Sequence, residues 1–151
     1  MNRNDKLIAV LQQEIETLDK ATQVLLYSYS TCEKIIHNKN YNEEEAIALE
    51  ALTSRFARLS DILLQKTWRA LFAVELEEEG TPRDRINKAE KKELIGNAHN
   101  FLDMRILRNK IAHEYNIENT NKLYKEVYQN IPELLDAVKR LHQYATEKNL
   151  I

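Results

Sequence analysis

The stretch DKLIAVLQQEIETLDKATQVLLYSYSTCEKII, residues 5–36, decides the fold class of this chain. Apolar side chains recur in it at the spacing of an amphipathic α-helix. The residues of this stripe are Leu7, Val10, Leu11, Ile15, Leu18, Ala21 and Leu25. Such a helix must bury its apolar stripe against other elements. The pattern therefore predicts a long first helix from Asp5 to about Ile36, with further helices packed against it.

A second helix is predicted from about Glu43 to Glu79, again from apolar residues at helical spacing. The next residues indicate a stop and a restart. Gly80 is predicted to take the left-handed conformation at the helix end, and Thr81 to cap the helix that follows. Pro82 suits a first helical turn, and Asp84 completes an approximate capping box with Thr81.

Three more helical regions complete the predicted fold. They are expected over residues 82–94, 98–114 and 120–148. Residues 116–119 are predicted to be a loop, and Pro132 is predicted to kink or restart the last helix. The pattern favours an all-α, antiparallel four-helix up-and-down bundle with an additional short helix, forming one domain over residues 1–151.

The composition agrees with a helical protein and excludes several functional classes. The chain has 151 residues, of which 43% are hydrophobic and 30% charged, with only 2 Gly and 2 Pro to form turns. A formal net charge of −2 argues against a generally basic protein that coats nucleic acid. The single cysteine, Cys32, and the lack of a long apolar run predict a cytoplasmic protein with no membrane segment.

The stretch LRNKIAHEYN, residues 107–116, stands at the end of the fourth predicted helix and gathers several polar side chains. One face of this helix, predicted to enter the core, consists of Met104, Leu107 and Ile111. A second stripe begins apolar and ends polar, and consists of Leu102, Ile106, Asn109 and His113. Two such faces on one helix favour two packing partners, namely the core of the chain and a second subunit.

Arg108 and His113 are the candidate functional pair in this stretch. On a regular helix they lie roughly 140° apart, so they need not touch within one chain. A symmetric homodimer could gather two copies of each in one cleft. Asn109, four residues before His113, could orient the imidazole, and Tyr115, seven residues after Arg108, returns to the side of Arg108.

The chemistry that fits this set is RNA cleavage without a metal ion. Histidine side chains titrate near neutral pH, so one can accept the 2′-hydroxyl proton or protonate the leaving oxygen. An arginine can hold the scissile phosphate and stabilise the charge added during the reaction. The sequence has no phosphate-binding loop, no dinucleotide fingerprint and no zinc-ligand spacing, so we expect neither a metal nor a cofactor.

Structural explanations compete with the functional interpretation of these residues. A histidine near a helix C-terminus also interacts favourably with the helix dipole. A solvated basic face is predicted for Arg83, Arg85, Lys88, Lys91 and Lys92. A solvated acidic helix end is predicted for Glu75, Glu77, Glu78 and Glu79.

LRNKIAHEY resembles the RX4HXY signature of HEPN domains of the HepT-like toxin type, with Arg108, His113 and Tyr115 in the motif positions. The upstream stretches TPRDRINKAEKKELI and FLDMRI are also similar to that family. The resemblance implies a homodimeric endoribonuclease toxin of a type VII HEPN/MNT toxin–antitoxin system, with Arg108 and His113 catalytic. It also implies an MntA-like minimal nucleotidyltransferase antitoxin that transfers AMP from ATP to Tyr115. Transfer RNA is a substrate known in that family, and nothing in this sequence selects it.

Two other interpretations remain open from the sequence. Some HEPN proteins that resemble this chain are non-catalytic substrate-binding partners of nucleotidyltransferases, and their motif is often degenerate. The intact Arg108, Asn109, His113 and Tyr115 favour the nuclease. The third interpretation is a helical interaction protein in which the motif occurs by chance.

Overall fold

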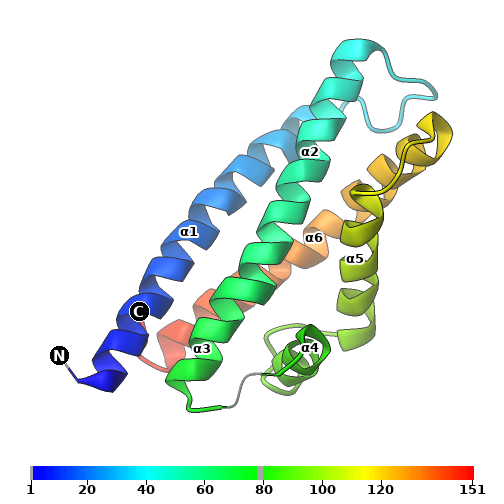
Figure 1. The fold of residues 1–151 in the computed structure, drawn as a ribbon. Helices are drawn as coiled ribbons and strands as arrows, with labels where there is room; N and C mark the ends of the chain where they lie inside the picture. The colour runs from blue at the N-terminus through cyan, green and yellow to red at the C-terminus, as the bar shows by residue number, and fades with distance from the viewer. Residues whose placement is uncertain (1, 78–79) are drawn as a thin grey trace.

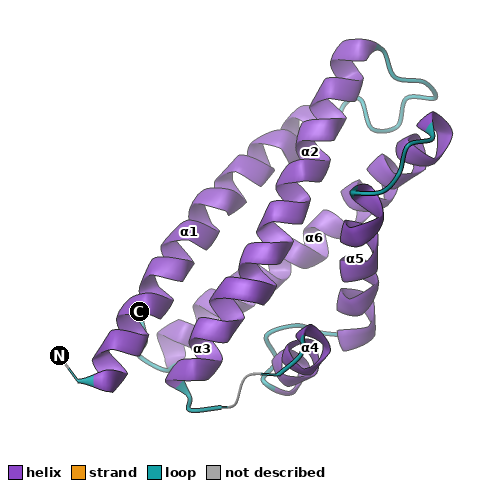
Figure 2. Ribbon diagram, in the orientation of Figure 1, coloured by secondary structure: helices purple, strands orange, loops and turns teal. Residues whose placement is uncertain are grey.

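The computed structural model describes residues 2–77 and 80–151, and every regular element in these residues is a helix (Figure 2). The elements are α1 (Arg3–Cys32), α2 (Glu43–Asp61), the π-helix η1 (Ile62–Thr67), α3 (Trp68–Val74), α4 (Pro82–Lys91), α5 (Ala98–Ile111) and α6 (Ile117–Glu147). The elements α2, η1 and α3 follow one another without a break and form one long helix. This helix runs antiparallel to α1, and α5 and α6 complete an up-and-down bundle with α4 across one end (Figure 1). The predicted all-α fold class is confirmed.

The core lies between the four long helices and is formed by most of the residues that helical periodicity predicted, although Val10 of the first predicted stripe is 52% exposed. Leu11, Leu18 and Leu25 of α1 are fully buried, as expected from their spacing. Trp68 of α3 packs on Phe101 of α5, with ring centroids 5.1 Å apart, and so joins the two halves of the bundle.

The long second helix ends earlier than the sequence pattern predicted. It stops at Val74, and Leu76 takes the left-handed conformation (φ 58°) while the Glu77 amide donates to the Phe72 carbonyl at 2.9 Å. The prediction of a left-handed Gly80 is therefore wrong, since no described glycine has a positive φ. Gly80 instead makes a close approach, because a Cβ there would lie 2.6 Å from the Asp84 carboxylate.

The restart after Gly80 follows the predicted chemistry. Thr81 and Asp84 form a complete capping box, in which each side chain accepts a hydrogen bond from the backbone of the other. Pro82 occupies the first turn of α4, where its missing N–H costs nothing. The predicted acidic helix end includes Glu78 and Glu79, which lie outside the described residues.

Two further helix boundaries differ from the predictions. The stretch 116–119 is not a loop, because Asn116 caps α6 by accepting a hydrogen bond from the Asn119 amide at 3.1 Å, and the helix starts at Ile117. The predicted restart at Pro132 is wrong, because α6 runs through the proline to Glu147, while the predicted kink stays a prediction. Ile131 and Leu134 on either side of the proline are fully buried, and this packing offsets the lost backbone hydrogen bond.

The predicted solvated basic face is wrong for three of its members, one of which is Lys88, whose Nζ lies 3.2 Å from Glu77. Arg85 is only 5% exposed and donates to the Gly80 carbonyl at 2.9 Å and to Gln65 Oε1 at 2.7 Å. Lys92 Nζ lies 3.1 Å from Glu75 and 2.5 Å from Glu77, so part of the acidic helix end is also paired. These contacts fasten α4 to the end of α3, a tertiary role that charge patterning alone does not reveal.

Candidate functional site

The candidate site lies where α5 ends and α6 begins. The predicted core face of α5 is confirmed, since Met104 and Leu107 are buried and Ile111 is half-buried. The helix ends at Ile111 rather than at Glu114 as predicted, and the His113 amide donates to the Lys110 carbonyl at 3.0 Å in the closing turn. His113 therefore stands on a short connection and not on the helix that carries Arg108.

Arg108 is held by a carboxylate that the sequence analysis did not identify. Its Nε donates to both oxygens of Asp61, at 3.0 and 3.1 Å, and its Nη2 donates to Asp61 Oδ2 at 2.8 Å. These hydrogen bonds raise the pKa of the Arg108 guanidinium, which stays charged. Forty-seven residues separate the two side chains, and no local pattern in the sequence links them.

The contact with Asp61 uses one edge of the guanidinium and leaves the other available. Within the described residues, Nη1 of Arg108 has no hydrogen-bonding partner. The Arg108 side chain is 31% exposed, so this edge can meet a ligand from solvent. An arginine fixed on one side and open on the other is well suited to bind a phosphate oxygen.

Arg108 and Asp61 line a groove between α2 and α5 with a volume of about 370 Å³. The residues that line it are Ser54, Ala57, Arg58, Asp61, Ile62, Arg108, Ile111 and Ala112. His113 is not among them, so one chain does not place both predicted catalytic residues in this groove. This agrees with the expectation that the pair need not touch within a chain, and the homodimer stays a prediction.

Asn109 and His113 are both exposed, and no hydrogen bond between them occurs in the described part of the chain. His113 lies beyond the end of α5 at Ile111, whereas the prediction placed both residues on one continuous helix. The supporting role of Asn109 stays a prediction.

Tyr115 is highly exposed, with 90% of its surface accessible. The carboxylate of Glu114 shapes the connection around it, accepting hydrogen bonds from the amides of Tyr115 at 3.1 Å and Asn116 at 2.9 Å. The backbone is thus held while the phenol extends into solvent. A tyrosine displayed in this way is accessible to a modifying enzyme.

Two apolar side chains of α5 and α6 are also exposed in the single chain. Ile106 on α5 is 53% exposed and Ile117 at the start of α6 is 79% exposed. Ile106 belongs to the second stripe of α5, which the sequence analysis assigned to a partner subunit. In the single chain this part of the stripe remains uncovered.

Neither a metal centre nor a membrane segment is found in residues 2–77 and 80–151. No group of three or more His, Cys, Asp or Glu side chains there is placed to hold a metal ion. The helices of the same residues also lack a segment long and apolar enough to cross a bilayer.

Comparison with known proteins assigns the chain to a family. No match was found among curated proteins or among solved structures. The family model described as nucleotidyltransferase substrate binding protein like matches residues 13–145, which include the whole candidate site and all of the bundle except the first turns of α1 and the last residues of α6. This is a HEPN-type family, in agreement with the coarse resemblance of the LRNKIAHEY stretch. The chain therefore belongs to the nucleotidyltransferase substrate binding protein-like family.

Proposed function

We propose that this protein is the toxin partner of a minimal nucleotidyltransferase and cleaves RNA without a metal ion, using Arg108 and His113. The main support for the proposal is the way in which the Arg108 guanidinium is held and exposed. Its guanidinium is fixed by Asp61, lines a groove and keeps Nη1 available for a phosphate oxygen. The candidate acid–base residue and the candidate modification site follow within seven residues of it.

The reaction needs two proton transfers at one phosphodiester. A His113 imidazole accepts the proton of the 2′-hydroxyl, and the freed oxygen attacks the phosphorus. The bond from phosphorus to the 5′ oxygen breaks, and a second imidazole protonates the leaving oxygen. The products are a 2′,3′-cyclic phosphate and a free 5′-hydroxyl. In a homodimer the second imidazole is the His113 of the other copy, while Arg108 stabilises the added negative charge.

Modification of Tyr115 provides the off-switch in this proposal. AMP transfer to its phenol adds a nucleotide and a negative phosphate beside a site that must receive an RNA phosphate. The 90% exposure of Tyr115 supports the access that a nucleotidyltransferase active site requires.

The test is RNA cleavage by the purified wild-type chain in the presence of EDTA. We expect cleavage to persist, and to fall by about 100-fold or more in His113→Ala, since general acid–base groups contribute about 10²–10⁴-fold. The matched control is His99→Ala, which removes an exposed histidine from the start of the same helix α5. Loss of cleavage in EDTA, or equal cleavage by wild type and His113→Ala, would refute the proposal.

A second candidate function is supported by the family description itself. A substrate-binding protein would form a stable complex with the nucleotidyltransferase and leave RNA intact. Growth after expression of the chain alone separates the two functions. Arrest that requires His113 supports the nuclease, whereas normal growth together with a stable complex supports the binding protein.

A further inference from the structure

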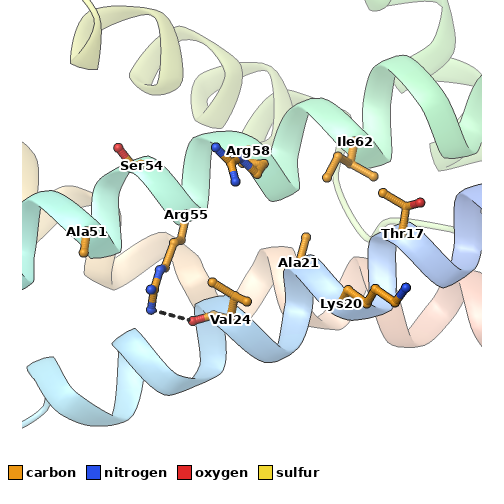
Figure 3. A pocket seen from close by; sticks show the side chains of 9 residues that line it. All are labelled: Thr17, Lys20, Ala21, Val24, Ala51, Ser54, Arg55, Arg58 and Ile62. Atoms are coloured by element: carbon orange, nitrogen blue, oxygen red, sulfur yellow. Dashed lines mark hydrogen bonds between the residues drawn. The ribbon is translucent and has the colours of Figure 1, made fainter.

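A second groove lies on the other side of α2 from the Arg108 groove. It runs between α1 and α2 and has a volume of about 530 Å³ (Figure 3). The residues that line it are Thr17, Lys20, Ala21, Val24, Ala51, Ser54, Arg55, Arg58 and Ile62. Ser54, Arg58 and Ile62 line both grooves, so they form a shared wall between the α1–α2 groove and the Arg108 groove.

The α1–α2 groove is basic although the whole chain is slightly acidic. Lys20, Arg55 and Arg58 line it, and no carboxylate does, whereas the chain has a formal net charge of −2. The acidic neighbour of Lys20 is Glu16, 3.5 Å away in a pair that is largely exposed and therefore weak. The local field of this groove consequently favours an anionic ligand.

The two arginines of the α1–α2 groove are held differently. Arg55 Nη1 donates to Ser28 Oγ at 2.7 Å and to the Val24 carbonyl at 3.2 Å, so neutral acceptors fix it against α1 (Figure 3 shows the Val24 bond). Arg58 is exposed, and its guanidinium has no hydrogen-bonding partner within the described residues. Among residues 2–77 and 80–151, no carboxylate pairs with either guanidinium, in contrast to Arg108 beside Asp61.

Apolar side chains line the groove between these charges, together with the polar Thr17 and Ser54. Ala21 and Ala51 are small and half-buried, and Val24 is 44% exposed. Small apolar side chains flanked by basic ones can contact the face of a nucleobase while the cations pair with the phosphates on either side. A peptide of acidic residues matches the charges alone, whereas a nucleic acid strand matches both the charges and the apolar floor.

We propose that the α1–α2 groove binds the single-stranded part of the RNA that leads away from the scissile phosphate, with Arg58 joining the two grooves. This inference rests on the proposed ribonuclease function and adds a substrate-binding track to it. Lys20, Arg55 and Arg58 bind successive phosphates, and the bases lie on the apolar floor. The track would make the protein prefer substrates with a single-stranded segment beside the cleaved bond.

The experiment measures binding of a fluorescent single-stranded RNA oligonucleotide to the His113→Ala chain, which removes cleavage from the measurement. Arg58→Gln combined with Lys20→Gln removes two phosphate contacts. We expect affinity to fall about tenfold at physiological salt. The negative slope of log K against log salt should become less steep by about 1.4. The matched control is Lys91→Gln combined with Lys139→Gln, two exposed lysines that do not line either groove.

Three outcomes would overturn the inference. The groove variant could keep the affinity and salt slope of its parent, the control variant could lose as much as the groove variant, or polyglutamate of equal charge could displace the RNA equally well. The last result would assign the groove to an acidic protein partner. Thermal melting of both double variants verifies that they are folded, as expected for exposed side chains.

The binding measurement and the cleavage measurement test the two hypotheses independently. A wild-type chain that never cleaves RNA, while the His113→Ala chain binds RNA through Arg58 and Lys20, refutes the ribonuclease and keeps the RNA-binding groove. A chain that cleaves RNA through His113 but binds equally well without Arg58 and Lys20 refutes only the groove.

Discussion

Replacing Asp61 by asparagine is the perturbation that most directly tests how the candidate site is built. The change keeps the size of the side chain and removes the negative charge that holds the Arg108 guanidinium through three contacts of 2.8–3.1 Å. The amide of asparagine can accept through only one of its two terminal atoms, so the bidentate geometry is lost. Arg108 would then sample several orientations in its groove.

The expected cost to folding is small. The Arg108 and Asp61 side chains are 31% and 44% exposed, and ion pairs of this exposure contribute about 0.2–1 kcal/mol. For a chain of this length, the melting temperature should fall by no more than about 4 °C. Cleavage should respond more strongly, because a misplacement of about 1 Å at a positioned group can cost about 100-fold. We expect kcat/KM for RNA cleavage to fall by about 10–100-fold, which corresponds to about 1.4–2.7 kcal/mol of transition-state stabilisation.

The assay compares RNA cleavage and thermal melting for the wild type, Asp61→Asn and Asp61→Glu. Glutamate restores the charge and should recover part of the activity, which a purely structural role would not require. The matched control is Asp103→Asn, which removes an exposed carboxylate from α5 that pairs with His99 at 3.5 Å. Unchanged or faster cleavage by Asp61→Asn would refute the reasoning, and a faster rate would mean that Asp61 masks Arg108 instead of positioning it.

Three other predictions follow from particular contacts. Leu76→Gly should stabilise the chain by about 1 kcal/mol, because Leu76 is 78% exposed and has a φ of 58°, which glycine adopts without strain. Leu76→Ala should not stabilise the chain. Equal melting temperatures for the wild type and both variants would contradict this prediction. Burial, and then the hydrogen bond to Glu75, raise the pKa of Tyr144 to about 12. The stabilising contribution of Tyr144 should therefore be present below pH 10 and lost as pH rises to about 12. The difference in unfolding free energy between wild type and Tyr144→Phe, measured by urea unfolding against pH, should shrink between about pH 10 and 12 and not below pH 10. Incubation with the cognate nucleotidyltransferase and ATP should add the mass of AMP to the wild type but not to Tyr115→Phe. The control is Tyr27→Phe, which lacks a 72% exposed tyrosine of α1 and should still gain the mass. Mass added to Tyr115→Phe would count against Tyr115 as the modification site.

Periodicity was sufficient to predict the fold, because the long helices each bury one continuous stripe. The first helix was predicted from residues such as Leu11 and Leu18, and both are fully buried. The boundaries were harder to predict, because local caps decide them. The second helix ends at a left-handed Leu76, four residues before Gly80, where the left-handed residue was expected. A leucine in the sequence gives no signal that it will end a helix in this conformation.

The candidate site was only partly predictable for a related reason. Arg108, His113 and Tyr115 lie within eight residues and form a motif that can be recognised along the chain. Asp61 and Arg58 lie on α2 and reach the same groove only through packing of α2 against α5. One sequence without tertiary information gives no reason to select these two residues from the other charged residues of a long helix.

The two functions considered for this family make different demands on the same side chains. Binding of a phosphate needs a fixed cation, and the Arg108–Asp61 pair with its available Nη1 meets that need without any acid–base group. Cleavage needs in addition a group that moves protons, and in this stretch His113 is the candidate for it. A substrate-binding partner should therefore lose affinity for a phosphate-bearing ligand in Arg108→Ala and retain it in His113→Ala, and neither the wild type nor these variants should cleave RNA. A ribonuclease should lose cleavage in both variants while His113→Ala still binds RNA. These two variants give the same result under both functions, so the wild type decides between them. Cleavage by the wild type that both variants lose supports the ribonuclease, and no cleavage by any of the three chains supports the binding partner.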